Sequence, residues 1–579
     1  MAENNSQTAE RVNLVYQSSV NGVNEDVELP FRTLVLSDLS CDEASSVLEG
    51  QEAIEISSAD LTSLFLNIKP RLLFKLENKL GSQEAGDLLV DYCINKLDDF
   101  KPQEIAKNVP VIRDLLSFIE ALNNIVNNEL ESSLENKNVV DALKSSGISI
   151  DEIKSQPESM AWLISDVEAR ITEQLNLILH HDDFQKMESA WRSLDFLLAR
   201  TDFTENCTLS VLNVNKQALI EDFEDAPEVF KSTFYQIVYS AEFGQFGGKP
   251  YGVIIGDYDF SPATPDIKLL QQIAIVCATA HAPFITSASA TFFHIDDYSS
   301  FSKLRDIASI FHQPAFEKWL AFRNTADARY IALCLPRFLL RSAYEESIGG
   351  LVYREKIKRN QNDVLWGNAA FAFASLLNKS FAKYRWCLNV TGKAHGVVEG
   401  LNIPLSNNMQ SALIPTQVLI NDRRESELVA QGFMPLSVHK GTDTAAFYSA
   451  YSSYDFSTRA ENENEVDLSE RLSAQIPYLF IVSRISHYIK IMQREHIGAW
   501  KNRRDIDQEL NKWLRQYVSD MDNPAAGVRG RRPLRRAEIK VREVEGKGDW
   551  FVTRIQITPH IKHMGKLFTL SENSRLEKN

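Results

Sequence analysis

The sequence predicts a mixed α/β protein whose core is a sheet covered by helices on both faces. Continuous apolar runs typical of buried strands, such as 33–39 and 251–255, occur far apart in the chain. From about residue 208 to 340, strand patterns alternate with helical patterns, as in a three-layer α/β core. The length of 579 residues predicts more than one domain, and 44% hydrophobic with 24% charged residues is an ordinary globular composition.

Strand and helix patterns follow one another in the first 126 residues. Apolar residues alternate with polar ones, as in half-buried strands, at Val12, Leu14, Tyr16, Val27, Leu29 and Phe31. Pro30 has no amide hydrogen to donate, so its strand is expected to lie at a sheet edge or to be bulged there. The segment 70–78 alternates as another strand, and 100–126 has the spacing of two helices separated at Pro110.

A polar segment at 127–160 marks the main boundary, and we predict a first region at 1–128, a junction at 129–160 and a second region at 161–579. The second region begins with two amphipathic helices that break at His180–Asp183. Its other predicted elements are a strand at 208–215, a helix at 366–384, a helical stretch at 468–500 interrupted at Pro477, and a β-hairpin at Ala537–Ile557. In that hairpin the alternating apolar positions are Ile539, Val541, Ile555 and Ile557.

Net charge, the length of the apolar runs and cysteine spacing argue against nucleic acid as a partner, against membrane insertion and against disulfide bonds. The net charge of −16 disfavours nucleic acid. The apolar run 273–285 is too short to span a bilayer, so no membrane insertion is expected. Six cysteines without CxxC spacing are typical of free thiols in a reducing cytoplasm. The first sixty residues carry twelve acidic side chains, whereas 529–542 carries seven cations, so the two ends can attract each other or a neighbouring copy.

The motifs that suggest chemistry do not fit it. Gly244, Gly247, Gly248 and Lys249 resemble a phosphate-binding loop, but Pro250 follows the lysine and the strand comes after the glycines. A tight turn into a buried strand is therefore predicted. At 180–183, a helix N-cap at Asp182 or Asp183 is a better interpretation than metal binding. The segment 560–563 lacks the glutamate of a zinc hydrolase, and no serine-hydrolase elbow occurs. No catalytic residue, cofactor or metal ligand is predicted, and the protein is not expected to be an enzyme.

A predicted helix at 503–518 has one apolar and one polar side. Its buried stripe is expected to be Ile506, Leu510, Trp513 and Tyr517. The other side is expected to carry Arg504, Asp507, Asn511 and Arg515, either as a solvated face or as a docking surface. Strand-forming segments at both ends of the chain have ladder edges that can pair with another chain, which favours ordered assembly over catalysis.

Several long segments resemble a known family. The small contractile-sheath subunit of the bacterial type VI secretion system (TssB, or VipA) is similar to "RVNLVYQ…VELPFRTLVLSDLS" and "KPRLLFKLENKL…LDDFKPQEIAKNVPVIRDLLSFIEALNNI". The large subunit (TssC, or VipB) is similar to "ILHHDDFQKMESAWRSLDFLL", "EFGQFGGKPYGVIIGDYDFSP", "LPRFLLRSAY", "WGNAAFAFA", "LINDRRESELVAQGFMPL" and "RLSAQIPYLFIVSRISHYIK". Together these resemblances cover roughly 11–145 and 160–565.

The resemblance implies a contractile-tail-sheath-like core built from both regions, with an additional large-subunit domain and helical segments. It implies a helical homopolymer in the bacterial cytoplasm that surrounds an inner tube of Hcp, contacts a baseplate and contracts to propel tube and spike. It also implies strands exchanged between neighbouring copies, for which the expected residues are Val12, Leu14, Tyr16, Val27, Leu29, Ile539, Val541, Ile555 and Ile557. The expected inner-tube contacts are Arg503, Arg504, Lys512 and Arg515.

Two departures from the family qualify these expectations. The subunits are normally separate chains, and here they are joined, which fixes a one-to-one ratio. The family's AAA+ disassembly ATPase reads a helix near the free N-terminus of the large subunit. That terminus is internal here, and the matching segment is expected to be shortened to something like 139–154, so recycling by that ATPase is doubtful. The alternatives are an α/β nucleotide-binding protein or enzyme, and a sheath-like tube that does not contract.

Leu14→Pro is expected to block filament growth without changing the melting temperature.

Overall fold

The structure is a computed structural model that describes most of the chain. It describes all residues except 1–10, 12–13, 21–22, 42–46, 81–86, 127–156, 246, 358–362, 404–413, 439–440, 457–470, 496–502, 522–531, 533, 544–550, 560–569 and 576–579. In the part it describes, no helix has both the length and the apolar character needed to cross a membrane.

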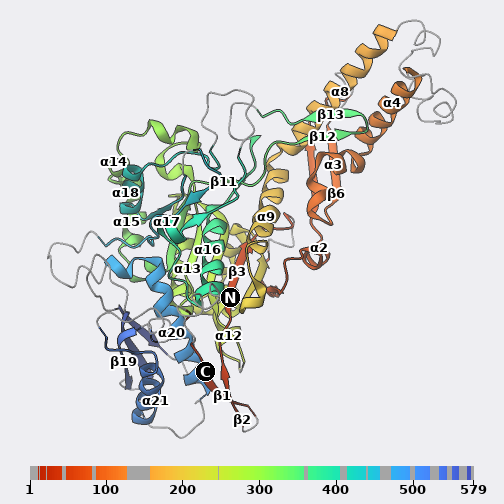
Figure 1. The fold of residues 1–579 in the computed structure, drawn as a ribbon. Coiled ribbons are helices and arrows are strands. Elements are labelled where there is room, and N and C mark those ends of the chain that lie inside the picture. The colour runs from red at the N-terminus through yellow and green to blue at the C-terminus, as the bar shows by residue number, and fades with distance from the viewer. Residues whose placement is uncertain are drawn as a thin grey trace, which may run out of the picture.

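A seven-stranded sheet forms the centre of the molecule (Figure 1). Its order is β16 (Phe433–Pro435), β10 (Ile331–Leu335), β9 (Phe284–Ala288), β8 (Tyr251–Phe260), β3 (Phe31–Ser37), β7 (Cys207–Asn213) and β4 (Ile54–Ile56). All neighbours pair in parallel except β4, which is antiparallel to β7. The mostly parallel sheet confirms the predicted α/β class, and its strands are continuously buried runs, as parallel sheets require.

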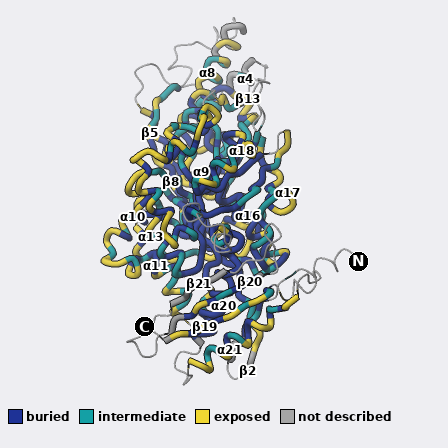
Figure 2. Tube along the Cα trace, turned by 90° about the vertical axis from the view of Figure 1, so that its left-hand side faces the viewer, coloured by how far each residue is buried: buried dark blue, intermediate teal, exposed yellow. Residues whose placement is uncertain are grey.

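Helices cover both faces of this sheet. Successive residues of β3 point to opposite faces: Thr33 donates a hydrogen bond to Asn378 of α16 (Ala369–Tyr384), whereas Arg32 pairs with Glu242 of α12 (Ala241–Phe243). The α16 side is extended by α9 (Asp182–Leu198), and the α12 side includes α13 (Thr264–Ala280). Figure 2 shows the resulting buried interior.

An arm extends from the core (Figure 1). It combines elements of the first region with elements of the second. The first region provides α2 (Thr62–Ile68), β5 (Arg71–Leu76), β6 (Leu88–Cys93), α3 (Pro102–Asn108) and α4 (Pro110–Val126). The second provides α8 (Pro157–Leu179), β12 (Glu345–Ile348) and β13 (Leu351–Arg354). Helices α4 and α8 pack together, so the chain leaves the first region and enters the second at neighbouring positions on the arm.

A C-terminal module lies at the other end of the molecule. It consists of α20 (Ile476–Glu495), α21 (Arg503–Arg515) and a sheet in the order β19 (Leu534–Glu543), β20 (Phe551–Pro559) and β21 (Leu570–Arg575). The N-terminal hairpin of β1 (Tyr16–Val20) and β2 (Val23–Val27) lies beside it (Figure 1). The predicted hairpin at 537–557 is confirmed, with Ile539 opposite Ile555.

The remaining elements are short or peripheral. They are α10 (Lys216–Asp225), α11 (Thr233–Tyr235), α14 (Ile307–Phe311), α15 (Glu317–Arg323), α17 (Gly392–His395), α18 (Asp422–Ala430), β11 (Phe338–Leu339), β14 (Trp366–Gly367), β15 (Val397–Val398), β17 (Ser437–Val438) and β18 (Ala445–Ala446). The predicted breaks at Pro110 and at 180–183 are confirmed by the boundaries of α3, α4, α8 and α9.

The expectation that Pro30 marks a sheet edge is wrong. Residues 28–30 lie between β2 and β3 and belong to neither strand. Strand β3 begins at Phe31 and lies in the middle of the sheet, between β7 and β8. Because Pro30 precedes the strand, its missing amide removes no ladder hydrogen bond. A strand of the first region thus completes the sheet of the second.

Candidate functional site

The first candidate site is the contact between β3 and the glycine-containing loop before β8. The Arg32 guanidinium pairs with Glu242 at 2.7 Å and donates to the Lys249 carbonyl at 2.5 Å. Glu242 in turn accepts from the Lys249 amide at 3.0 Å. A Cβ at Gly248 would lie 2.0 Å from the Glu242 carbonyl oxygen, and Gly247 has a φ of +78°. The glycines therefore let the loop fold back and enclose Arg32, which confirms the predicted turn.

The position of this loop argues against a nucleotide site. Nucleotides in parallel α/β sheets bind outside the carboxyl ends of the strands, whereas this loop lies at the amino end of β8. A cavity of about 470 Å³ does lie at the carboxyl ends of β3, β8 and β9. Its charged lining is Asp38, Asp182, Asp257, Asp259, Asp296, Asp297, Arg337 and Lys186. Six carboxylates against two cations disfavour a polyphosphate there.

Lys249→Ala is expected to leave folding and assembly unchanged. The Lys249 side chain is exposed, and Arg32 and Glu242 contact only its main chain. Isothermal titration with ATP and with GTP should give no binding for either the wild type or the variant. Nucleotide affinity that the substitution abolishes would contradict this account of the loop.

The second candidate site is the C-terminal module, where the structure brings together most of the residues predicted for strand pairing. One hydrophobic cluster contains Leu14, Tyr16, Leu29, Ile539, Val541, Ile555 and Ile557, together with residues of α20 and α21. Val27 packs against this cluster, and Val12 lies outside the described residues. The two ends of the chain therefore share a core within a single copy, although their strands belong to separate sheets.

Of the strand predicted at residues 11–16, the described residues 11, 14 and 15 lie in no strand of the single chain. Aromatic side chains form hydrogen bonds with the main-chain groups that a neighbouring strand would otherwise bind. Tyr488 donates from its hydroxyl to the Leu14 carbonyl at 2.7 Å and accepts from the Leu29 amide at 2.9 Å. Trp513 donates to the Val15 carbonyl at 2.8 Å. The segment is consequently anchored to α20 and α21, and the strand begins only at Tyr16.

This anchoring also corrects the expectation for Leu14→Pro. Leu14 is only 2% exposed, so it belongs to the core of the C-terminal module and does not lie outside every core. Truncating and bending the chain at a buried leucine costs packing as well as main-chain pairing. A lowered melting temperature is therefore expected, and this substitution does not separate folding from assembly.

Helix α21 presents its predicted apolar stripe to the same cluster. Leu510 and Trp513 are buried, and Ile506 packs against the cluster. Tyr517 is also buried in the cluster, but it lies just beyond the end of the helix, which is shorter than the predicted 503–518. The predicted tube contacts Arg503, Arg504, Lys512 and Arg515 are all exposed. The expectation that Asp507 and Asn511 share that polar side is wrong: Asp507 accepts from the Val541 amide at 3.1 Å, and Asn511 pairs with Ile539. These two side chains attach α21 to β19.

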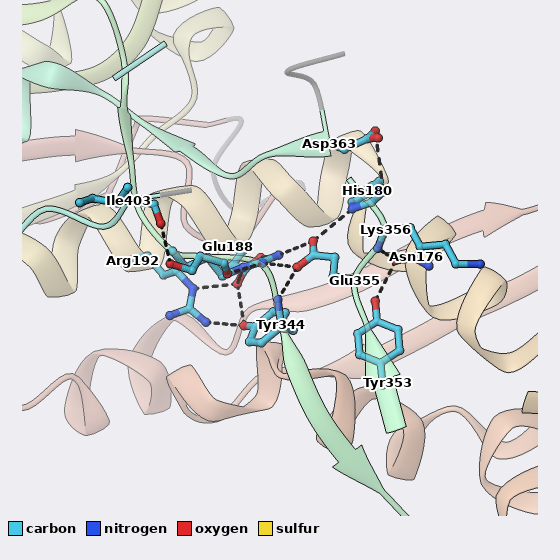
Figure 3. Close-up of polar contacts among 12 residues, drawn as sticks. Asn176, His180, Glu188, Arg192, Tyr344, Tyr353, Glu355, Lys356, Asp363 and Ile403 are labelled. Carbon is cyan, nitrogen blue, oxygen red and sulfur yellow. Dashed lines mark hydrogen bonds and ion pairs between the residues drawn. The ribbon is translucent and has the colours of Figure 1, made fainter. Parts of the chain in front are cut away.

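A third site, which sequence reasoning missed, is a buried ion-pair network at the base of the arm (Figure 3). Arg341 bridges two glutamates, Glu188 at 2.9 Å and Glu355 at 2.7 Å. Glu188 also pairs with Arg192 at 2.7 Å. Glu355 is also contacted by His180 at 3.1 Å. The available signal was the spacing of Glu188 and Arg192 inside an apolar helical stripe, which places a charged pair on a buried face.

This network connects the arm to the core. Glu188 lies on α9, whereas Arg341 and Glu355 flank the β12–β13 hairpin of the arm. Burial alone would raise the pKa of Glu355, but the contacts with His180 and Arg341 lower this pKa to about 2. The carboxylate is therefore ionised and paired, and the network links the arm to the core through buried charges that are costly to leave without their partners.

The histidine pair at this joint does not behave as predicted. His181, and neither Asp182 nor Asp183, is the N-cap of α9, and its Nδ1 accepts from the Asp183 amide at 3.3 Å. The His181 ring also stacks on Phe74 of β5, with 4.0 Å between ring centroids. His180 instead belongs to the ion-pair network, and its Nδ1 lies 3.7 Å from Oδ1 of Asp363. Within the described residues, no group of three or more histidine, cysteine or acidic side chains could hold a metal ion.

Comparisons with known proteins place these regions in one family. Residues 4–156 match the family described as "Type VI secretion system, VipA, VC_A0107 or Hcp2". Residues 161–454 match "EvpB/VC_A0108, tail sheath N-terminal domain", and 465–576 match "EvpB/VC_A0108, tail sheath gpW/gp25-like domain". Of the seven strands of the central sheet, β3 and β4 thus lie in the first matched segment, and β7, β8, β9, β10 and β16 lie in the second.

Two relatives from Pseudomonas aeruginosa strain PAO1 agree with these matches. The chain is 34% identical to the type VI secretion system sheath protein TssC1 over 521 residues, covering 86% of this chain and 98% of TssC1. It is 28% identical to the sheath protein TssB1 over 120 residues, covering 20% of this chain and 69% of TssB1. The chain therefore belongs to the type VI secretion system sheath family and is a sheath structural subunit that joins a TssB-like and a TssC-like region in one polypeptide.

Proposed function

We propose that each chain is a complete protomer of a contractile sheath, which polymerises with copies of itself and contracts to propel a tube and spike. The observation that carries this proposal is the position of β3, which lies between β7 and β8. The TssB-like region completes the sheet of the TssC-like region, so one chain supplies the whole protomer. We propose 1–128, 129–160 and 161–579 as its divisions; the middle one lies mostly outside the described residues.

The partners follow from this role. We propose an inner tube of Hcp, baseplate components and no nucleic acid, with assembly in the bacterial cytoplasm and no enzymatic activity. Recycling by a AAA+ ATPase is doubtful, because the helix it would read at a free terminus is internal to this chain. The match to 98% of TssC1, however, does not support a shortening of that segment.

Strand pairing between copies is proposed at the C-terminal module. The residues concerned are Val12, Leu14, Tyr16, Val27, Leu29, Ile539, Val541, Ile555 and Ile557. Their side chains, apart from that of Val12, already pack in or against one cluster within a chain, so pairing between copies would use main-chain edges. Each added ladder hydrogen bond is worth about 0.5–1.5 kcal/mol net, and the contribution recurs at every protomer of a filament.

The exposed cations of α21 are proposed to face the tube. Arg504→Glu with Arg515→Glu is expected to weaken sheath formation around tubes, most strongly at low salt, because exposed charges are screened as ionic strength rises. Sedimentation of co-assembled tubes across a salt series measures the effect. A matched control reverses Lys186 and Arg423, which are 72% and 81% exposed on other helices. Equal assembly of both double variants at every salt concentration would remove α21 from the tube interface.

Negative-stain microscopy of the expressed chain tests the proposed function. We expect hollow filaments of two diameters, corresponding to extended and contracted states. Filaments of a single diameter under all conditions would favour a tube that does not contract. A chain that forms no filaments and whose melting temperature rises with ATP or GTP would favour the nucleotide-binding alternative.

A further inference from the structure

We propose that the outward face of β19 and β20 is a basic docking surface that binds an acidic segment around β4 of a second copy of this chain. This inference rests on the proposed polymerisation of the chain with copies of itself. The apolar residues of β19 and β20 that pack into the C-terminal module are Ile539, Val541, Ile555 and Ile557. The residues between them point outward. Those described as exposed, which we call the basic face, are Arg536, Glu538, Lys540, Arg542 and Arg554.

The charges of the basic face are not balanced within one chain. Lys540 lies directly opposite Arg554 in the ladder between β19 and β20, and like charges at opposite positions destabilise a sheet. Lys540 pairs with Glu538 at 3.0 Å. Arg536, Arg542 and Arg554 form no ion pair with any described residue. A negatively charged partner from outside the chain would relieve this repulsion.

A surface of the opposite charge lies at the β4 edge of the central sheet. The exposed charged residues of this segment, which we call the acidic edge, are Glu49, Glu52, Glu55 and Asp60. The sequence has no lysine or arginine between Arg32 and Lys69. Among the described residues, none of the four carboxylates has a cation as an ion-pair partner. Charge complementarity therefore assigns the acidic edge as the occupant of the basic face.

The two surfaces lie on opposite sides of one molecule. In Figure 1, β19 lies at the lower left, whereas α2, which follows β4 along the chain, lies on the right. The contact must therefore join different copies, each of which uses its basic face toward one neighbour and its acidic edge toward the next. A contact between two different surfaces produces an open helical filament unless it closes into a ring, so this arrangement suits a sheath.

Charge reversal in the full-length chain, with no tube protein present, tests the contact. The face variant carries Lys540→Glu with Arg554→Glu, and the edge variant carries Glu52→Lys with Glu55→Lys. Each variant alone should need an about tenfold higher concentration to form filaments, measured by sedimentation, because like charges then meet at every contact. An equimolar mixture should assemble as the wild type does. In the mixture, the reversed face meets the reversed edge and the native face meets the native edge.

The control is the Lys186→Glu, Arg423→Glu double variant, which should assemble as the wild type does because both cations lie on other helices. Assembly of the face variant at the wild-type concentration would overturn the inference. Failure of the mixture, when each variant also fails alone, would show that the basic face has another occupant and would overturn it too. Absence of wild-type filaments would contradict the proposed function and this inference with it.

The single variant Arg554→Glu separates docking from folding. It replaces the repulsion between Arg554 and Lys540 with an attraction. The melting temperature of the unassembled protein should therefore equal or exceed that of the wild type, whereas filament formation should weaken. A lower melting temperature together with lost assembly would show that Arg554 supports the fold and would overturn the inference.

Discussion

Leu34→Asp is expected to prevent the chain from folding. Leu34 is 0% exposed on β3 and lies between β7 and β8 in the central sheet. An unpaired carboxylate buried there costs several kcal/mol, and the lost leucine packing costs about 2–5 kcal/mol more. The sum is comparable with the whole stability of a typical domain, about 5–15 kcal/mol. Soluble yield and thermal unfolding followed by circular dichroism measure the effect.

The matched control is Leu73→Asp on β5. Leu73 belongs to the same TssB-like region and to a strand, but its side chain is 60% exposed. The control should therefore be soluble and should unfold within a few degrees of the wild type, since surface substitutions usually change stability by about 0.5 kcal/mol or less. If both variants fold equally well, β3 is not part of the core and one chain does not supply a complete protomer.

Arg341→Met is expected to destabilise the joint between the arm and the core by about 3–5 kcal/mol at neutral pH. Methionine fills part of the space but leaves Glu188 and Glu355, which are 0% and 1% exposed at their side chains, without the cation that bridges them. Scanning calorimetry measures the loss. Arg354→Met is the matched control, because Arg354 is 71% exposed and pairs with an exposed Glu345. A surface pair of that kind contributes about 0–1 kcal/mol.

The pH dependence of this joint follows from Glu355. Its pKa is about 2 in the folded protein against an ordinary value of 4.5, so its ionised form stabilises the fold above pH 4.5. That stabilisation is lost as the pH falls from 4.5 toward 2. Without Arg341 the pKa of Glu355 should lie nearer its ordinary value, so the variant should lose less stability over this window than the wild type. Parallel loss in both proteins would contradict the pairing.

Local patterns predicted the elements of this fold well. The break at Pro110 and the hairpin around Ile539 and Ile555 depend on residues close in sequence, and the structure confirms both. The central place of β3 was not predictable, because Pro30 suggested an edge and the partners of β3 begin at Cys207 and Tyr251. Periodicity shows that a strand is buried, but it does not show between which strands it lies.

For the candidate sites too, local patterns predicted some features, whereas features that depend on distant parts of the chain were not predictable. Exposed cations and a buried stripe on α21 follow from helical spacing. The roles of Asp507 and Asn511 do not, because they depend on how α21 packs against β19. The alternation at Leu14 indicated a strand, but the aromatic hydroxyl and indole groups of α20 and α21 satisfied the main chain there. The Arg341 network joins residues more than a hundred positions apart, beyond the reach of any local pattern.

Electron cryomicroscopy of filaments formed by this chain, with no separate sheath subunit present, tests the central claim most directly. We predict a helical lattice whose repeating unit is one chain, with β3 in the sheet between β7 and β8 in every unit. Formation of filaments only after a separate TssB-like or TssC-like protein is added, or a repeating unit in which the β3 position is empty, would contradict the claim that one chain is a complete sheath protomer.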